Sequence, residues 1–159
     1  MKDIQIIRAE QEHLRAGAYY VRIQAMAKAY HITLREEFDD RDGPDCHYLL
    51  ALDEDFPAAT CRWFETEPGT AEIGRVVVLP EYRDQHLGSQ IMREAEKWIA
   101  EAGYQKIVVS SRIGVEPFYE KLGYIYNESH EAHSTTFACV YMEKTVSSSE
   151  THAGKEEKS

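Results

Sequence analysis

The chain has 159 residues, 43% of them hydrophobic, which is the size and composition of one ordinary globular domain with its own core. A net charge of −10 disfavours binding to nucleic acid or to an anionic membrane, although backbone amides can still bind phosphate locally. No hydrophobic run approaches the ~18 residues of a membrane span, and three widely spaced cysteines are typical of a reduced, cytoplasmic protein.

The first half of the sequence predicts a strand, a long helix and three more strands. Residues 4–8 are short and β-branched, as in a strand, and small or apolar residues recur at helical spacing over 12–31. Residues 35–46 are rich in Asp and contain Gly-Pro, which predicts a loop; their spacing does not fit an EF-hand. Strands follow at 47–52, 58–65 and 71–79, and the last ends in a wholly apolar run typical of a strand covered on both faces.

The second half alternates helices and strands. A helix is predicted at 87–102, ended by Gly103, then a strand at 106–110, a helix at 115–122 ended by Gly123, and strands at 124–127 and 137–143. This order predicts an α+β (mixed α/β) fold with one domain over residues 1–145. Residues 146–159 contain no aromatic and almost no apolar residue, which predicts a disordered tail.

One segment has the pattern of a phosphate-binding element. A buried strand ends at Pro80, a short polar loop follows, and a helix opens at Leu87. The first-turn amides of a helix have no partners within it, and the helix dipole adds roughly half a positive charge there. The N-terminal end of this helix is therefore suited to binding a pyrophosphate. A dinucleotide fingerprint would need three glycines and a P-loop would need Gly-Lys-Ser/Thr, whereas the loop offers only Gly88.

Two motifs resemble the GNAT superfamily of N-acetyltransferases. The run VVVLPEYRDQHLGS, residues 76–89, is similar to the superfamily's cofactor motif V-x-P-x-x-R-x-x-G-x-G, with Arg83 and Gly88 matching and His86 standing where the first loop glycine is usual. The run VEPFYEKLGY, residues 115–124, resembles its closing motif F-Y-x-x-x-G-F/Y. The blocks LREEFDDRDGPDCHYLL and IGRVVVLPEYR are most similar to the ElaA-like branch.

The resemblance implies a fold, an activity and a binding site. The expected fold is a mostly antiparallel sheet of six or seven strands, splayed at the cofactor site and flanked by about four helices. The expected activity is transfer of the acetyl group of acetyl-CoA to a primary amine, by direct attack in a ternary complex without a metal. The residues expected to bind the cofactor are Val76, Val77, Val78, Arg83, Asp84, Gln85, His86, Leu87, Gly88, Ser89, Phe118 and Tyr119.

The resemblance also suggests the residues that move protons. Tyr119 matches the general acid that protonates the departing thiolate, and a phenol with an ordinary pKa near 10 suits a thiolate of pKa about 8.5; packing alone is the alternative. Glu72 resembles the general base of the histone-acetylating branch, and its even spacing from Val78 predicts that the two share a strand face. An ordered water is the alternative base.

Other readings of the sequence remain open. The carboxylates of residues 36–45 either recognise a cationic amine or stay solvated, and His86 either contacts a phosphate or points to solvent. His130 and His133 lack a third metal ligand, so no metal is expected. Exposed terminal strands make a homodimer plausible. The fold also suits a domain that binds acyl-CoA or a partner protein without turnover.

Overall fold

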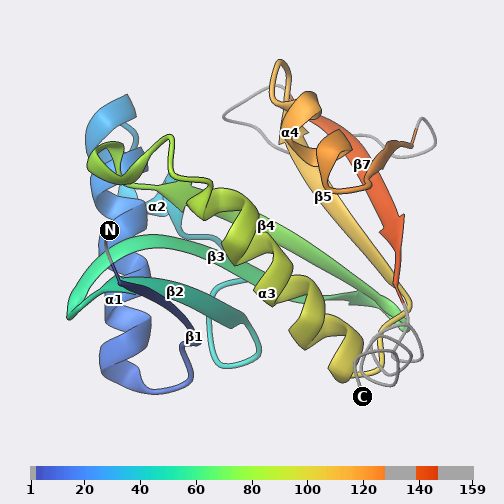
Figure 1. Cartoon of the computed structure of the whole chain (residues 1–159), viewed down its shortest axis with the longest axis horizontal. Helices are drawn as coiled ribbons and strands as arrows, with labels where there is room; N and C mark the ends of the chain where they lie inside the picture. The colour runs from blue at the N-terminus through green and yellow to red at the C-terminus, as the bar shows by residue number, and fades with distance from the viewer. Residues whose placement is uncertain (1–2, 128–138, 147–159) are drawn as a thin grey trace. The chain divides into compact units, whose positions relative to one another are not determined.

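The computed structural model describes residues 3–127 and 139–146, and in it seven strands are hydrogen-bonded in the order β1-β2-β3-β4-β5-β7-β6 (Figure 1). The pairs β1–β2, β2–β3, β5–β7 and β6–β7 are antiparallel, and β4–β5 is parallel. The predicted mixed fold and its mostly antiparallel sheet are therefore confirmed. The strands are β1 (Ile4–Arg8), β2 (His47–Asp53), β3 (Phe56–Glu67), β4 (Thr70–Val78), β5 (Lys106–Arg112), β6 (Ile125–Tyr126) and β7 (Cys139–Thr145).

Four α-helices occur within the described residues, together with one π-helix and one 3₁₀ turn. They are α1 (Glu12–Arg22), the π-helix η1 (Ile23–Lys28), α2 (Leu34–Glu37), the 3₁₀ turn η2 (Pro80–Tyr82), α3 (Leu87–Glu101) and α4 (Glu116–Lys121). Over this part of the chain, no helix combines the length and the hydrophobicity that crossing a bilayer requires.

The long first helix departs from its prediction in its second half. The chain leaves α-geometry after Arg22 and continues as a π-helix, whose hydrogen bonds span one more residue per turn. The wider turns rotate later residues to another face, so Ala29, which the regular spacing placed with Ala25, is exposed while Ala25 is buried. His31, at φ 56°, takes the left-handed conformation that commonly ends a helix.

The chain divides into two compact units. Unit 1 comprises Met1–Phe64 and Arg75–Ala95, and unit 2 comprises Glu65–Gly74 and Glu96–Ser159. The prediction of one domain with a boundary at residue 145 stays a prediction, and residues 147–159 of the expected tail lie outside the described residues. So do residues 137–138 of the last predicted strand, and both His130 and His133.

The core of unit 1 lies where small residues of α1 and η1 pack on larger residues of the strands. The members are Ala9, Ala18, Val21, Ala25, Cys46, Tyr48, Leu50, Phe64, Val77 and Leu79. Gly17 lets α1 approach β2 closely, because a Cβ there would lie only 2.8 Å from Cδ2 of Leu50. The small residues thus fix the spacing between helix and sheet on which the predicted site depends.

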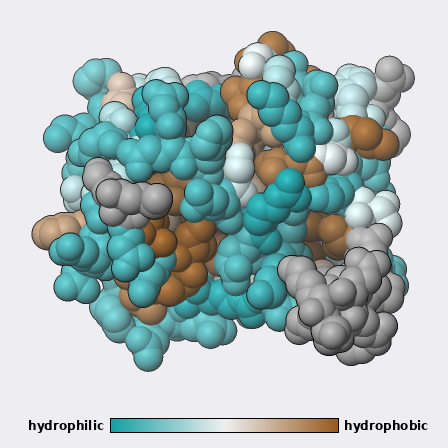
Figure 2. All heavy atoms as spheres, viewed as in Figure 1, coloured by the Kyte–Doolittle hydropathy of each residue, from teal (hydrophilic) through white to brown (hydrophobic). Residues whose placement is uncertain are grey.

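Unit 2 is built on β5, which pairs with β4 over Thr70–Ile73 and with β7 along its whole length. The buried residues Ile107 and Val109 of β5 share this unit with the buried side chains of α4 and of the last part of α3, which begins at Glu96. On the face shown in Figure 2, hydrophilic residues predominate and hydrophobic ones gather in limited patches, as expected for a chain with 28 acidic residues.

Candidate functional site

The predicted phosphate-binding element is present in unit 1 as β4, η2, a short loop and α3. The amide of Leu79 donates to the carbonyl of Ala58 at 2.9 Å, which joins the end of the strand to β3. Helix α3 begins at Leu87, as predicted, and the amide of Gln90 donates to the carbonyl of His86 at 3.1 Å. The amides of the three residues in between precede that bond, so they have no carbonyl partner within the helix.

The loop before α3 has an unusual backbone. Asp84, at φ 65°, and His86, at φ 59°, both take the left-handed conformation, which costs an L-residue about 1–2 kcal/mol relative to glycine. Both side chains are exposed, and Arg83 reaches back to the carbonyl of Val78 at 3.4 Å. His86 therefore keeps the backbone conformation of the glycine that the cofactor motif usually has at its position.

Substituting His86 by glycine should stabilise the protein. His86→Gly removes the left-handed penalty, partly offset by the greater freedom of glycine in the unfolded chain, so we expect the free energy of unfolding to rise by about 0.5–1 kcal/mol. Thermal and urea unfolding would measure it. The neighbouring Gln85 has no positive φ, so Gln85→Gly is the matched control and should destabilise slightly. A destabilised His86→Gly variant would mean that the imidazole makes a compensating contact.

The second half of β4 contains the amides expected to hold the thioester. The ladder between β4 and β5 ends at Ile73, whereas the strand runs on to Val78. Arg75 lies between these points with φ 52°, a left-handed conformation in the middle of a strand. It interrupts the regular pleat, so the even spacing between Glu72 and Val78 does not by itself place them on one face. The argument that paired these two residues is weakened, and the role of Glu72 stays a prediction.

The remaining predicted site residues lie in unit 2. Tyr119 is in α4 and is 8% exposed; its ring packs edge-on against Phe118, with centroids 4.9 Å apart, and against Tyr124 at 5.9 Å. The Tyr124 hydroxyl donates to the buried Glu96 carboxylate at 2.8 Å, and Lys144 Nζ donates to the same carboxylate at 3.3 Å. These contacts hold the Tyr119 ring in one place without using its hydroxyl.

Glu72 borders a small polar cavity in unit 2. The cavity has a volume of about 130 Å³ and is lined by Thr66, Glu67, Thr70, Glu72, Lys106, Val108 and Tyr141. Glu72 is half-buried and pairs with Val108 of β5 in the sheet. A space of this size admits a few water molecules beside the carboxylate, so either Glu72 or a water next to it remains a candidate base.

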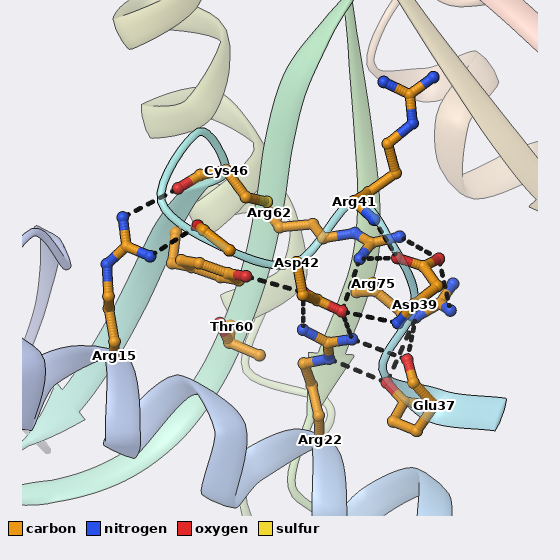
Figure 3. A network of polar contacts seen from close by, with 12 residues as sticks. Arg15, Arg22, Glu37, Asp39, Arg41, Asp42, Cys46, Thr60, Arg62 and Arg75 are labelled. Carbon is orange, nitrogen blue, oxygen red and sulfur yellow. Dashed lines mark hydrogen bonds and ion pairs between the residues drawn. The ribbon is translucent and has the colours of Figure 1, made fainter. Parts of the chain in front are cut away.

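The sequence suggested that the carboxylates of the acidic segment, residues 36–45, either recognise an amine or stay solvated. At three positions they instead bind arginines of the same unit (Figure 3). Arg22 Nε donates to Glu37 at 2.9 Å and Arg22 Nη1 to Asp42 at 2.7 Å. Both terminal nitrogens of Arg62 donate to Asp39, at 2.8 and 2.9 Å. These carboxylates are therefore neither simply solvated nor available to an incoming amine. We name Arg22, Glu37, Asp39, Asp42, Arg62 and Arg75 the arginine–carboxylate cluster.

The cluster is buried at three of its six residues and more open at Asp39 and Arg75, and its three arginines balance its three carboxylates. Arg22 is fully buried, Glu37 is 2% exposed and Arg62 3%. Burial alone would raise the pKa of Asp42, but the hydrogen bond and charge of Arg22, with the charge of Arg62, hold that pKa well below its usual range. Asp39 shows the same balance, with burial opposed by Arg62 and Arg75, and its pKa is also lowered. Asp39 and Asp42 therefore stay ionised near neutral pH.

Removing one partner should therefore change both the stability and its pH dependence. Asp42→Asn removes the negative charge that pairs with the buried Arg22, and we expect the free energy of unfolding to fall by roughly 3 kcal/mol at pH 7. The depressed pKa of Asp42 stabilises the fold above the unfolded pKa of about 4, and this contribution is lost as the pH falls below it. Urea unfolding from pH 6 to pH 2 should show the two proteins converging in acid; parallel curves would contradict the assignment.

The sequence had a local signal for part of this arrangement. Thr33 and Glu36 form a capping box at the start of α2, in which each side chain binds the other's backbone amide. The pattern Thr-x-x-Glu is a known helix start. The three arginines had no such signal, because their partners lie 15 or more residues away. In the described part of the chain, no group of three or more His, Cys, Asp or Glu side chains is arranged to hold a metal.

Known proteins resemble this chain in sequence and in fold. Residues 10–124 match the Acetyltransferase (GNAT) family. The uncharacterised N-acetyltransferase YjcF of Bacillus subtilis is 29% identical over 75% of this chain and 83% of its own length. The structure of an N-acetyltransferase from Lactobacillus plantarum covers 89% of this chain and 97% of its own, with a TM-score of 0.82 and 26% identity.

More distant structures share the fold alone. The PaiA N-acetyltransferase of Thermoplasma acidophilum, solved with coenzyme A, has a TM-score of 0.68 at 17% identity, covering 91% of this chain and 99% of its own. ElaA of Escherichia coli, which gives its name to the branch that the sequence resembles, has a TM-score of 0.72 at 16% identity, covering 91% of this chain and 99% of its own. The family match extends over both motifs, all of the chain between them and most of the chain before them. This chain therefore belongs to the GNAT family of acetyltransferases.

Proposed function

We propose that this protein transfers the acetyl group of acetyl-CoA to a primary amine, with both substrates bound at once. The observation that carries the proposal is the segment from β4 to α3. It combines the cofactor motif with a left-handed residue, His86, at the glycine position and a helix start at Leu87. Membership of the GNAT family and the coenzyme A complex of a protein with the same fold support it.

Each part of the segment has an expected role. The pyrophosphate of acetyl-CoA would bind the amides of residues 83–89, where the positive end of the α3 dipole adds to their donors. Val76, Val77 and Val78 would offer backbone amides to the pantetheine arm and to the thioester carbonyl. Such preorganised donors usually provide the largest electrostatic contribution to acyl transfer.

The chemical step would form one bond and break another. The neutral amine attacks the thioester carbonyl, so a C–N bond forms as the C–S bond breaks. Tyr119 gives its hydroxyl proton to the departing sulfur, and the proton lost by the amine goes to Glu72 or to a water. The phosphate-binding residues belong to unit 1, while these two side chains belong to unit 2, so their meeting at one site is part of the proposal.

The proposal includes a limited role for the acidic segment in binding the acceptor. Glu37, Asp39 and Asp42 are neutralised by arginines, so the acidic segment offers a cationic amine only Asp40 and Asp45 as exposed carboxylates outside the cluster and the α2 cap. Recognition of a cationic amine by the carboxylates of residues 36–45 therefore has less support than their number in the sequence indicated.

The proposal is tested by turnover with a panel of amines. The full chain is incubated with acetyl-CoA and polyamines, amino acids, aminoglycosides or peptides with free N-termini, and both free thiol and acetylated amine are measured. We expect at least one class of amine to be acetylated at a rate that depends on the enzyme concentration. Tight acetyl-CoA binding without any acetylated amine would favour the non-catalytic binding domain instead.

A further inference from the structure

Arg75 is an unlikely residue at its position in β4. It takes the left-handed conformation, at φ 52°, which glycine adopts readily and other residues avoid. Gly74 stands next to it, yet has no positive φ. The left-handed conformation, which we call the left-handed turn, therefore occurs at an arginine although a glycine is adjacent. Such a conformation persists only where the surroundings over-determine it.

The Arg75 side chain is held at two points by the arginine–carboxylate cluster (Figure 3). Its Nε donates to the Glu37 carbonyl at 3.1 Å and lies 3.3 Å from the Glu37 carboxylate, and its Nη2 donates to Asp39 at 3.3 Å. The receiving groups are themselves fixed, because Arg22 binds the Glu37 carboxylate and Arg62 grips both oxygens of Asp39. Glu37 and Asp39, which we call the anchor, are thus held by other arginines independently of Arg75.

The Arg75 side chain is half-buried, with 30% of it exposed, and it forms ion pairs with Glu37 and Asp39. Burial, followed by the positive charge of Arg62, lowers the pKa of Arg75, and the Glu37 and Asp39 carboxylates only partly compensate. The contacts of Arg75 with Glu37 and Asp39 tie a strand residue to the end of α2 and to the segment that follows.

The residues that follow Arg75 are those expected to meet the thioester. The β4–β5 ladder ends at Ile73, two residues before Arg75, and Val76 comes directly after it. A left-handed residue at this point redirects the peptide groups that follow it. The backbone amides of residues 76–78 therefore depend on the turn for their direction.

We propose that Glu37 and Asp39 are positioning residues, which lock the left-handed turn at Arg75 and so aim the amides of residues 76–78 at the thioester carbonyl of acetyl-CoA. This inference rests on the proposed function. It assigns the acidic segment the task of shaping the donor site, in place of the amine recognition considered from its sequence.

Two substitutions at Arg75 separate conformation from side-chain chemistry. Arg75→Ala removes the guanidinium but keeps the left-handed penalty, so the strand should relax and kcat/KM for acetyl-CoA should fall about 10²-fold, as when one preorganised donor is lost. Arg75→Gly also removes the guanidinium but adopts the turn freely. We expect it to recover at least ~10-fold of the loss. Arg35→Ala, an exposed arginine of α2 outside the cluster, is the control and should match the wild type.

The same logic applies to the anchor. Asp39→Asn should lower kcat/KM several-fold in the wild-type background but not when combined with Arg75→Gly, because the turn then needs no anchor. Equal losses in Arg75→Ala and Arg75→Gly, with a raised KM for the amine, would overturn the proposal and make Arg75 a ligand of the acceptor. Wild-type rates in both variants would overturn it too, since the turn would not matter.

A readout independent of turnover keeps the two proposals distinguishable. In NMR spectra of the full chain without ligand, the amide signals of residues 76–78 should move and exchange faster with solvent in Arg75→Ala, but stay near their wild-type positions in Arg75→Gly. If no amine is acetylated by the wild type, the proposed function fails while this comparison still tests the lock. Unchanged amide signals in Arg75→Ala would refute the proposed positioning role of Glu37 and Asp39 and leave the proposed function untouched.

Discussion

Gly88→Asp should abolish measurable binding of acetyl-CoA while leaving the fold intact. Gly88 is the second residue of α3, among the amides that precede the first intrahelical hydrogen bond. A carboxylate there would sit against the expected pyrophosphate. Two like charges about 4 Å apart repel by roughly 4 kcal/mol at an effective dielectric constant of ~20, which corresponds to about a 10³-fold loss of affinity.

The same substitution should not harm stability. An acidic side chain in the first turn interacts favourably with the helix dipole, typically by about 0.3–1 kcal/mol, and aspartate replaces a glycine that is itself unfavourable within a helix. Binding and stability are therefore expected to change in opposite directions. Calorimetric titration with acetyl-CoA and thermal unfolding measure the two effects separately.

A graded control comes from the same position. Gly88→Ala adds a methyl group without charge, so it should weaken binding less than Gly88→Asp and stabilise the helix to a similar degree. Acetyl-CoA affinity within a few-fold of wild type in Gly88→Asp would show that the pyrophosphate binds elsewhere. A variant that fails to fold would contradict the placement of Gly88 in the first turn of α3.

The elements with a strong local pattern were predictable. Helix α3 begins at the predicted Leu87 and ends within one residue of the prediction, because its apolar residues recur at helical spacing and Gly103, at φ 95°, follows its end. Strand β5 begins at Lys106 as predicted, since a run of β-branched residues marks it. In both cases the residues that determine the structure are neighbours in the sequence.

The parts that sequence reasoning missed depend on distant partners or on small differences in periodicity. One π-turn differs from an α-turn by a single residue, so the pattern over 12–31 could not reveal η1. The buried arginines Arg22 and Arg62 look like solvent-exposed residues until their carboxylates are brought to them by the fold. The left-handed turn at Arg75 was equally hidden, because the adjacent Gly74 was the residue that the sequence would favour for it.

Tyr119→Phe should lower turnover by roughly 10²- to 10⁴-fold while acetyl-CoA affinity stays within a few-fold of wild type. A general acid acts only as negative charge grows on the departing sulfur, so it stabilises the transition state and not the bound thioester. Its removal therefore lowers kcat and kcat/KM together. Steady-state kinetics with a saturating amine, combined with direct titration of acetyl-CoA, measure both quantities.

The packing of Tyr119 predicts that the variant folds normally. Its ring is held edge-on by Phe118 and Tyr124, and the latter is fixed through its own hydroxyl by Glu96. Phenylalanine keeps all of these ring contacts, so the free energy of unfolding should change by no more than about 1 kcal/mol, the scale of one hydrogen bond. A loss of turnover in Tyr119→Phe would then report on the hydroxyl itself.

Tyr104→Phe is the control, because it also removes a phenol hydroxyl from a tyrosine of the same unit, in this case one that donates to Glu65 at 2.8 Å. It should leave turnover unchanged. Normal turnover in Tyr119→Phe would mean that a water or another residue protonates the sulfur and that Tyr119 only packs. Loss of acetyl-CoA binding would instead make the hydroxyl a ligand of the ground state. That outcome would refute the acid role while leaving the family assignment intact, because the family match extends over residues 10–124 and does not depend on one hydroxyl group.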